Sequence, residues 1–178
     1  MNDERRVTVL VRGGGVARVP ETARVTLAFH LRHKRRIRMT DDAGVPFLLD
    51  LEQATLMEDG DLLLLADGSG CIRVVAAREG VVDMIPATVE EGVRLAWHIG
   101  NRHTPLQVLP GGGLRILDDP VLADMLAGLG AQVTRCLAPF SPEGGAYGHG
   151  SRGGMERPKR SEDSIHEHGG HVHRHDHS

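Results

Sequence analysis

Seven histidines near the carboxyl end of the chain are the residues best suited to chemistry. They are His149, His166, His168, His171, His173, His175 and His177. Neutral imidazole is a good ligand for nickel, copper, zinc and cobalt ions. The residues around the last six histidines are mostly small or charged, with almost nothing apolar to bury. Residues 148–178 are therefore predicted to form a disordered, His-rich, metal-binding tail.

Two alternatives without a metal role are compatible with this composition. The first is a purification tag, but such a tag is usually an unbroken histidine run, whereas Glu167, Val172 and Asp176 interrupt this one. The second is a solvated segment that contains many histidines without binding metal. Metal binding accounts for the composition best, but composition alone does not show that metal handling is the purpose of the whole protein.

A further histidine, His103, is expected in an ordered turn. It follows Gly100, which is well placed to end a helix, and it precedes Thr104 and Pro105. His98 lies five residues earlier, a spacing that does not place both histidines on one helix face. Its neighbours Ala96 and Trp97 are apolar, so we expect His98 to be partly buried. Because single histidines serve many purposes, spacing alone makes His103 only a candidate ligand.

Common enzyme motifs are absent from the sequence. Glycines 111–113 are not followed by the Lys-Ser/Thr pair of a phosphate-binding loop, and there is no His-Glu-x-x-His motif. Cys71 and Cys136 are isolated, with no zinc or redox spacing and no paired base. A metal-dependent hydrolase would need a general base beside a metal-bound water, and none is apparent. We therefore predict that the protein is not an enzyme.

Length and charge narrow the class of protein. A chain of 178 residues suits one domain or two small ones, and a net charge of −3 indicates neither nucleic acid nor an anionic membrane as a partner. No apolar run is long enough to span a bilayer, and no signal-peptide core follows Met1. We expect a cytoplasmic protein with reduced thiols.

The first half of the chain has the period-two alternation of β-strands, clearest from Arg24 to His30. Further strands are expected at 7–11, 37–40, 46–50 and 61–65. We predict a partner-docking β-domain over residues 1–75, with five or six strands. The basic run Arg32–Arg38 within it is either a docking patch for an acidic surface or a solvated run that protects a sheet edge, and we favour the second.

The second half alternates strands with two helices. Thr88 and Glu91 match a capping box that begins one helix, and Asp118 or Asp119 before Pro120 begins the other, which Gly130 ends. The apolar stripes are Val89, Val93, Ala96 and Trp97 in the first helix and Leu122, Met125, Leu126 and Leu129 in the second. With strands at 81–85, 105–109, 114–117 and 132–137, the order is β-α-β-β-α-β. This order predicts an α+β, ferredoxin-like domain over residues 76–147.

The segment Gly100-Asn-Arg-His-Thr-Pro-Leu-Gln107 resembles the Gly-Asn-Arg-His-x-Pro-x-Gln signature of the UreE family, the urease accessory nickel chaperones. Other segments resemble the family in the same order along the chain. They are 35–38, 42–44, 59–62, 118–126, 139–143 and 145–149. The likeness covers about residues 20–149, and its specificity is high because independent motifs occur in the right order.

The resemblance implies a fold, a metal and partners. It implies a β-domain joined to a ferredoxin-like domain, a homodimer, and a Ni(II) site at the dimer interface to which His103 contributes. His98 matches a family histidine to which the resemblance gives a structural or supporting role. It also implies the urease-maturation GTPase UreG and the urease apoprotein with its accessory complex as partners. Some family members carry histidines just before the second helix, but residues 115–119 contain none, which puts that auxiliary site in doubt.

Physical reasoning agrees with an interface site. One imidazole is too little to hold a metal ion, but a twofold axis duplicates every residue and can bring two His103 side chains together. The remaining positions stay open to water or tail histidines, so the ion can be released, unlike one in a closed structural site. Affinity alone favours Cu(II) over Ni(II), so nickel is implied by the resemblance. Zn(II), Cu(II) and Co(II) are further candidates in vitro.

The expected function is thus delivery of Ni(II) for assembly of the urease active site by a metallochaperone. The alternative is a general metal storage or detoxification protein that uses the tail as its sink. In that case, removing residues 149–178 abolishes most protection against metal, while substitution of His103 has little effect.

Proton competition provides a first test of histidine ligation. Imidazole must be neutral to bind a metal ion, so Ni²⁺ affinity should weaken as the pH falls through about 6.5. Calorimetric titrations between mildly acidic and mildly alkaline pH measure this dependence. A flat affinity over that range argues against histidine ligands.

Overall fold

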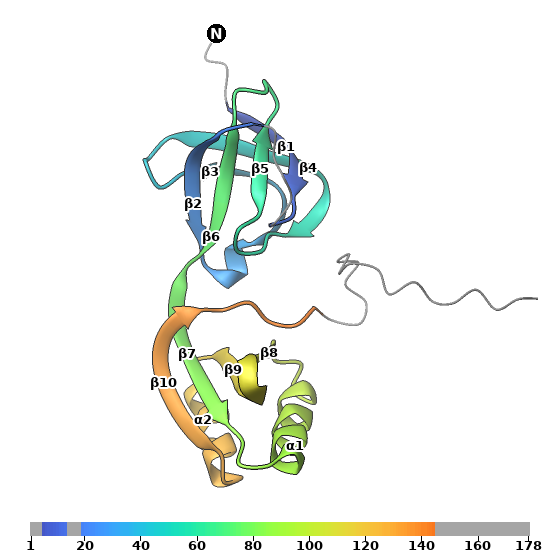
Figure 1. Ribbon diagram of the computed structural model, residues 1–178, viewed down its shortest axis with the longest axis vertical. Helices are drawn as coiled ribbons and strands as arrows, with labels where there is room; N and C mark the ends of the chain where they lie inside the picture. Colours follow the sequence, from blue (N-terminus) through green and yellow to red (C-terminus); the bar gives the residue numbers. More distant parts are fainter. Residues whose placement is uncertain (1–4, 14–18, 145–178) are drawn as a thin grey trace, which may run out of the picture. The chain divides into compact units, whose positions relative to one another are not determined.

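The computed structural model describes residues 5–13 and 19–144 (Figure 1). His149 and the six histidines from 166 to 177 lie outside the described residues, as does the predicted tail. In chain order the elements are β1 (Arg6–Val11), β2 (Glu21–Leu27), η1 (Phe29–Leu31), β3 (His33–Thr40), β4 (Pro46–Leu56), β5 (Leu62–Leu65), β6 (Cys71–Ala76), β7 (Arg78–Ile85), α1 (Val89–Gly100), β8 (Gln107–Val108), η2 (Pro110–Gly112), β9 (Leu114–Leu117), α2 (Pro120–Gly128) and β10 (Gln132–Pro139).

The first six strands form one curled sheet in the order β2-β6-β5-β1-β4-β3 (Figure 1). The pairs β1–β4 and β2–β6 are parallel, and the other neighbours are antiparallel. Alternate residues of these strands point inward, and Val7, Leu49 and Ile72 are among those fully buried in the core. The prediction of five or six strands is confirmed. The described part of this region contains the short η1 and no α-helix.

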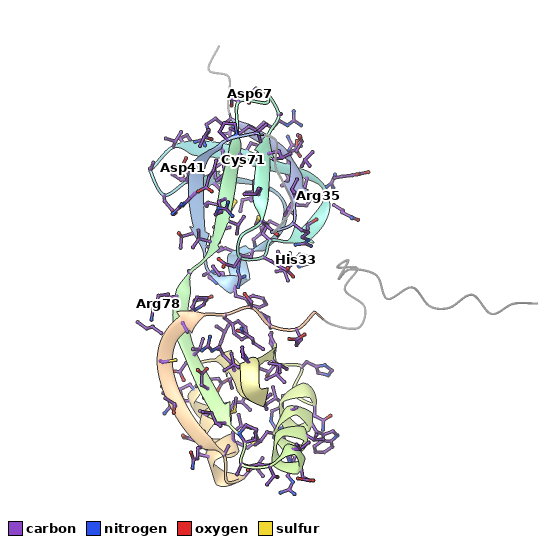
Figure 2. All side chains as sticks on the ribbon, viewed as in Figure 1. His33, Arg35, Asp41, Asp67, Cys71 and Arg78 are labelled. Carbon is purple, nitrogen blue, oxygen red and sulfur yellow. The ribbon has the colours of Figure 1, made fainter. Side chains whose placement is uncertain are left out.

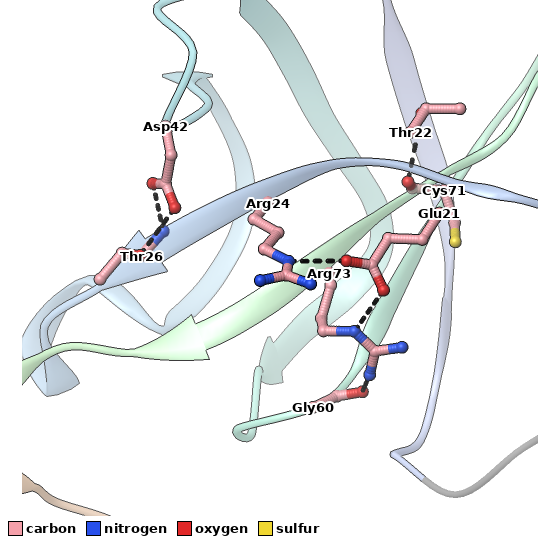
Figure 3. A network of polar contacts seen from close by, with 8 residues as sticks. All are labelled: Glu21, Thr22, Arg24, Thr26, Asp42, Gly60, Cys71 and Arg73. Carbon is pink, nitrogen blue, oxygen red and sulfur yellow. Dashed lines mark hydrogen bonds and ion pairs between the residues drawn. The ribbon is translucent and has the colours of Figure 1, made fainter.

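Charged side chains tie the strands of this sheet together on its outside. Glu21 accepts hydrogen bonds from Nε of Arg24, at 2.7 Å, and from Nε of Arg73 on β6, at 2.6 Å (Figure 3). These two bonds lower the pKa of Glu21. Asp42 accepts hydrogen bonds from both the backbone N–H and the hydroxyl of Thr26, each at 2.8 Å. The turn after β3 is thereby fastened to β2.

The strand predicted at 24–30 is shifted toward the amino terminus. β2 ends at Leu27, and the chain turns into the 3₁₀ helix η1 at Phe29. The backbone N–H of Phe29 donates to Oε2 of Glu79 at 2.8 Å, and its ring meets Phe140 edge-on with the centroids 5.2 Å apart. The alternation through residue 30 was misleading because Phe29 packs against residues far away in the sequence.

The basic run Arg32–Arg38 divides into two parts. β3 begins at His33, earlier than predicted, and lies at an edge of the six-stranded sheet, where Figure 2 shows His33 and Arg35. Charged side chains along an edge strand discourage pairing with other chains. Arg32, however, is not part of any surface patch, because it is only 1% exposed. Its inclusion in that run as a surface residue was wrong.

The remaining four strands form a second sheet in the order β10-β7-β9-β8, in which every neighbouring pair is antiparallel. Its core joins strand residues such as Met84 and Ile116 to helix residues such as Ile99 and Leu126, all fully buried. None of the helices described within 5–13 and 19–144 is long and apolar enough to cross a membrane.

Both predicted helix starts are confirmed. The hydroxyl of Thr88 accepts a hydrogen bond from the N–H of Glu91 at 3.1 Å, and Asp119 accepts one from the N–H of Leu122 at 3.0 Å, with Pro120 in the first turn of α2. Gly130 follows α2 with a φ of 97°, in the left-handed region that glycine occupies without strain. Local capping chemistry is therefore enough to place both helices.

The apolar stripe predicted for α1 is not its buried face. Val89, Val93 and Trp97 are 79%, 65% and 61% exposed, whereas Leu95 and Ile99 are fully buried. Apolar residues occur on two sides of this helix, and only one side can face the sheet. In α2 the predicted stripe does contribute to the core: Leu122 and Leu126 are buried, and Met125 and Leu129 pack against them.

The tight turn after β3 depends on the carboxylate of Asp41, the first residue after that strand (Figure 2). It accepts hydrogen bonds from Nη1 of Arg5 at 2.7 Å and from the N–H groups of Ala43 and Val45 at 3.0 and 2.9 Å. Its side chain is only 2% exposed. Burial acts to raise the pKa of Asp41, but the bonds from Arg5, Val45 and Ala43 together outweigh it and lower the pKa.

We expect Asp41→Asn to lower the free energy of unfolding at neutral pH by about 1–3 kcal/mol, since a buried charge-assisted network is broken. Because the pKa of Asp41 is lowered in the folded state, its ionised carboxylate stabilises the fold at pH values above the unfolded-state pKa. This stabilisation is lost as the pH falls through the folded-state pKa. The difference between wild type and Asp41→Asn should therefore shrink as the solution is acidified. Urea unfolding of both proteins at a series of pH values measures this difference in the free energy of unfolding.

The matched control is Glu52→Gln, which changes an exposed carboxylate on β4. This substitution should change the free energy of unfolding by less than about 0.5 kcal/mol. Equal stability of Asp41→Asn and wild type at neutral pH would contradict the role of Asp41.

Candidate metal site

His103 lies in the turn between α1 and β8. Its backbone N–H donates to the carbonyl of Gly100 at 2.9 Å, and the N–H of Arg102 donates to the carbonyl of Ile99 at 3.0 Å. These bonds close the end of the helix. The imidazole of His103 is exposed, so the turn presents it to solvent.

The backbone of His103 is left-handed, with a φ of 53°. It is the only non-glycine residue with positive φ among residues 5–13 and 19–144. Most side chains are strained in this region, although histidine occurs there more often than most residues. A histidine held in an unfavourable conformation at an exposed tip is more typical of a functional residue than of a packing residue.

His98 lies on the last turn of α1 and is half-buried. Its ring meets Trp97 edge-on, with the centroids 4.9 Å apart. Its backbone carbonyl accepts a hydrogen bond from Nη1 of Arg102 at 2.7 Å. A cation at this position satisfies a free carbonyl at the helix end. These contacts give His98 and Arg102 a clear part in shaping the turn that carries His103.

The two cysteines have different surroundings. Cys71 lies on β6 in the six-stranded sheet and is 1% exposed, and burial raises the pKa of its thiol (Figure 2). Cys136 on β10 is exposed, with its Sγ 3.8 Å from Oδ2 of Asp83. Asp83 is itself held by two hydrogen bonds from Arg115, at 2.6 and 2.8 Å. Neither environment brings together a set of ligands.

Within the described ranges, no group of three or more His, Cys, Asp or Glu side chains is placed to hold a metal ion. The sequence-predicted ligands are therefore not gathered into one centre there. His103 and His98 lie on the same short stretch of chain, and the seven predicted ligands from His149 to His177 lie outside the described residues.

The exposed face of α1 is a feature that the sequence analysis missed. Val89 and Val93 also line a hollow of about 520 Å³ beside α1, together with Ala96 and Leu114. Exposed apolar side chains that adjoin one another are typical of interaction surfaces. The stripe was visible in the sequence, but its periodicity does not say whether it faces the protein's own sheet or another molecule.

Comparison with known proteins places the chain in a family. Models of the N-terminal and C-terminal domains of the UreE urease accessory protein match residues 13–77 and 79–177. The chain belongs to the UreE family. Its Gly-Asn-Arg-His segment, residues 100–103, is the one that forms the end of α1 and the left-handed turn.

Curated UreE relatives agree with this assignment. Urease accessory protein UreE of Rhodopseudomonas palustris (strain HaA2) is 49% identical over 128 residues, which cover 72% of this chain and 59% of the relative. The protein of the same name from Azorhizobium caulinodans is 44% identical over 153 residues, covering 82% and 72% of the two chains. That of Burkholderia pseudomallei (strain K96243) is 46% identical over 141 residues, covering 79% and 66%. The match thus spans about three fifths of the Rhodopseudomonas UreE protein.

Proposed function

We propose that this UreE-family chain is a homodimeric metallochaperone that delivers Ni(II) for assembly of the urease active site. His103 of both subunits holds the transferable ion, and the histidines of the tail collect and buffer metal. Its partners are the GTPase UreG and the urease apoprotein with its accessory complex, in the cytoplasm. Residues 1–75 are the docking domain, 76–147 the metal-binding domain and 148–178 the tail.

The observation that carries this proposal is the exposed imidazole of His103 on a left-handed turn. Within the described residues its side chain takes part in no hydrogen bond or ion pair. A side chain at such a tip can meet its copy across a twofold axis, which supplies two ligands from one residue. Two imidazoles with open positions bind an ion that a partner can still remove. Nickel as the cargo rests on family membership.

The exposed face of α1 supports the dimer. Val89, Val93 and Trp97 follow one another at spacings of four residues, so they project from one side of the helix that ends at the His103 turn. Burial of this face against the same face of a second copy removes apolar surface from water. Such an isologous contact would hold the two α1 helices together near the point where the two His103 turns must meet.

The architecture of the second sheet supports a ferredoxin-like metal-binding domain. Its elements follow the order β7-α1-β8-β9-α2-β10, and its strands lie in the order β10-β7-β9-β8 with antiparallel neighbours. This is the succession expected of a split β-α-β unit. Two loops connect α1 to its neighbouring strands, one from β7 and one to β8. The His103 turn belongs to the second loop, at the carboxyl-terminal end of the helix.

The first test separates His103 from the tail. We define the tail-serine variant as the full-length chain with His→Ser at positions 149, 166, 168, 171, 173, 175 and 177. We expect this variant to retain one tight Ni²⁺ per dimer. Adding His103→Asn should weaken that binding by more than about tenfold, because both imidazoles of the site are lost. Calorimetric titration with Ni²⁺ measures both the affinity and the number of ions bound.

Asparagine is the appropriate replacement because it tolerates the left-handed backbone at this position. His33→Asn is the matched control, since His33 is also exposed but lies on β3. Unchanged tight binding after His103→Asn would refute the proposed role of His103. Loss of all binding in the tail-serine variant, before His103 is changed, would favour the storage alternative.

A charged substitution on the exposed apolar face of α1 tests the proposed dimer interface. Val93→Glu should convert the dimer to a monomer, because an interface cannot bury an unpaired carboxylate without a large cost. Sedimentation velocity measures the mass. Val121→Glu is the control, since Val121 is a similarly exposed valine on α2, at 81%. A dimer that survives Val93→Glu would place the interface elsewhere.

A further inference from the structure

The hydrogen-bond pattern changes at the carboxyl end of α1. The N–H of Asn101 donates to the carbonyl of Trp97 at 3.0 Å, four residues back, as in an α-helix. The N–H groups of Arg102 and His103 instead reach carbonyls only three residues back, at 3.0 and 2.9 Å. The chain therefore leaves the helix through a turn that is tightened to 3₁₀ bonding.

This change passes over the carbonyl of His98. In a continued α-helix its donor would be the N–H of Arg102, but that group is bonded to the carbonyl of Ile99 instead. The side chain of the same arginine takes its place, because Nη1 of Arg102 donates to the His98 carbonyl at 2.7 Å. Side chains commonly satisfy the carbonyls that a helix end leaves over. Arg102 thus closes the helix end with both its backbone and its guanidinium.

His103 follows this closure directly and has a left-handed backbone, with a φ of 53°. Helices commonly end with one residue in this conformation, but it is usually glycine and sometimes asparagine, because most side chains are disfavoured there. A histidine stays in this region only when its surroundings hold it there. Among residues 101–103, Arg102 is the only one whose side chain makes a hydrogen bond within the described chain. Its bond is therefore the side-chain contact that fixes His103 from the helix side.

The chain on the other side of His103 is also fixed. Thr104 precedes Pro105, which disfavours helical backbone at Thr104 and confines it to extended conformations. The carbonyl of Leu106 accepts a hydrogen bond from the N–H of Glu143 at 2.7 Å. Because both flanks of His103 are held, the direction of its imidazole is set by the turn and changes if the turn opens.

We infer that Arg102 is a positioning residue for metal binding at His103. Its bond to the His98 carbonyl keeps the turn closed and the backbone of His103 left-handed, so the imidazole keeps the direction that the shared site requires. This inference rests on the proposed function. When only a fraction of turns has the competent conformation, the apparent affinity falls by that fraction. In a site that takes one imidazole from each subunit, the fraction enters twice.

Three substitutions separate the hydrogen bond from the charge. Arg102→Ala removes the donor to the His98 carbonyl, whereas Arg102→Lys retains a cation with N–H donors at the end of a long side chain. Lysine can satisfy the last carbonyls of a helix in the same way. Arg94→Ala is the matched control, because Arg94 is an exposed arginine of α1 that lies outside the turn.

The experiment measures Ni²⁺ affinity by calorimetry in the tail-serine variant, with and without each substitution. We expect Arg102→Ala to weaken binding by about four- to tenfold, the square of a two- to threefold loss of competent turns. Arg102→Lys should stay within about twofold of the tail-serine variant, and Arg94→Ala should leave the affinity unchanged. Sedimentation velocity should show the same dimer in all four proteins. A monomer in Arg102→Ala would overturn the inference, because Arg102 would then act through the interface.

Hydrogen exchange of the His103 amide, followed without metal, reports the turn itself. It should accelerate in Arg102→Ala but not in Arg102→Lys or Arg94→Ala, while the amides of the buried residues Leu95 and Ile99 stay protected. Loss of protection at Leu95 as well would overturn the inference, because Arg102 would then support the whole helix.

Unchanged Ni²⁺ affinity or unchanged exchange at His103 in Arg102→Ala would also overturn the positioning role. Failure of the proposed function gives a different result, since His103→Asn would then leave tight Ni²⁺ binding unchanged. The exchange measurement needs no metal, so it still decides whether Arg102 holds the turn.

Discussion

The burial of Phe140 is the contact on which the arrangement of the chain depends. This residue follows directly after β10, and its ring and carbonyl meet Phe29 and Arg32 from the segment between β2 and β3. Residues more than a hundred positions apart are thereby joined within a unit, residues 1–148, that contains both sheets. After Phe140, Ser141 and Glu143 are hydrogen-bonded to Gln107 and Leu106 at the other edge of the second sheet.

The contact also has an energetic cost, which is the burial of the charged side chain of Arg32. Arg32 is fully buried, and burial lowers its pKa, against the opposing influence of Glu79, Asp59 and Glu58. Among the described residues, its Nε is the one buried side-chain nitrogen or oxygen without a hydrogen-bond partner. Such a group costs free energy unless other contacts compensate. The hydrogen bond to Phe140 and the cation–π contact with Phe29 are the compensating interactions visible here.

The features linked to the proposed function lie outside both cores. His103 is presented by a left-handed turn, and the apolar face of α1 is exposed. This separation suits a carrier, since a metal ligand held at the surface can exchange its ion without unfolding the core. It also explains why substitutions at these positions are expected to change binding or assembly more than stability.

Several predictions from the sequence were correct because they depend on short-range chemistry. Thr88 and Asp119 cap their helices, Gly130 adopts the left-handed backbone that ends α2, and the strands alternate as their apolar residues require. The errors arose where a residue meets a distant one. The strand predicted through residue 30 ends at Leu27, because Phe29 packs against Phe140. In the basic run Arg32–Arg38, Arg32 is buried and is not a surface residue.

The sequence by itself determined the helix ends and the family, because caps and the Gly-Asn-Arg-His segment are local properties of the chain. Only the tertiary structure decided which apolar side of α1 faces solvent, that His103 is left-handed, and that the residues after β10 run to the β8 edge of the second sheet. These depend on long-range packing: a helix with apolar residues on two sides is oriented by the sheet beneath it, and a crossing segment is placed by the strands it meets.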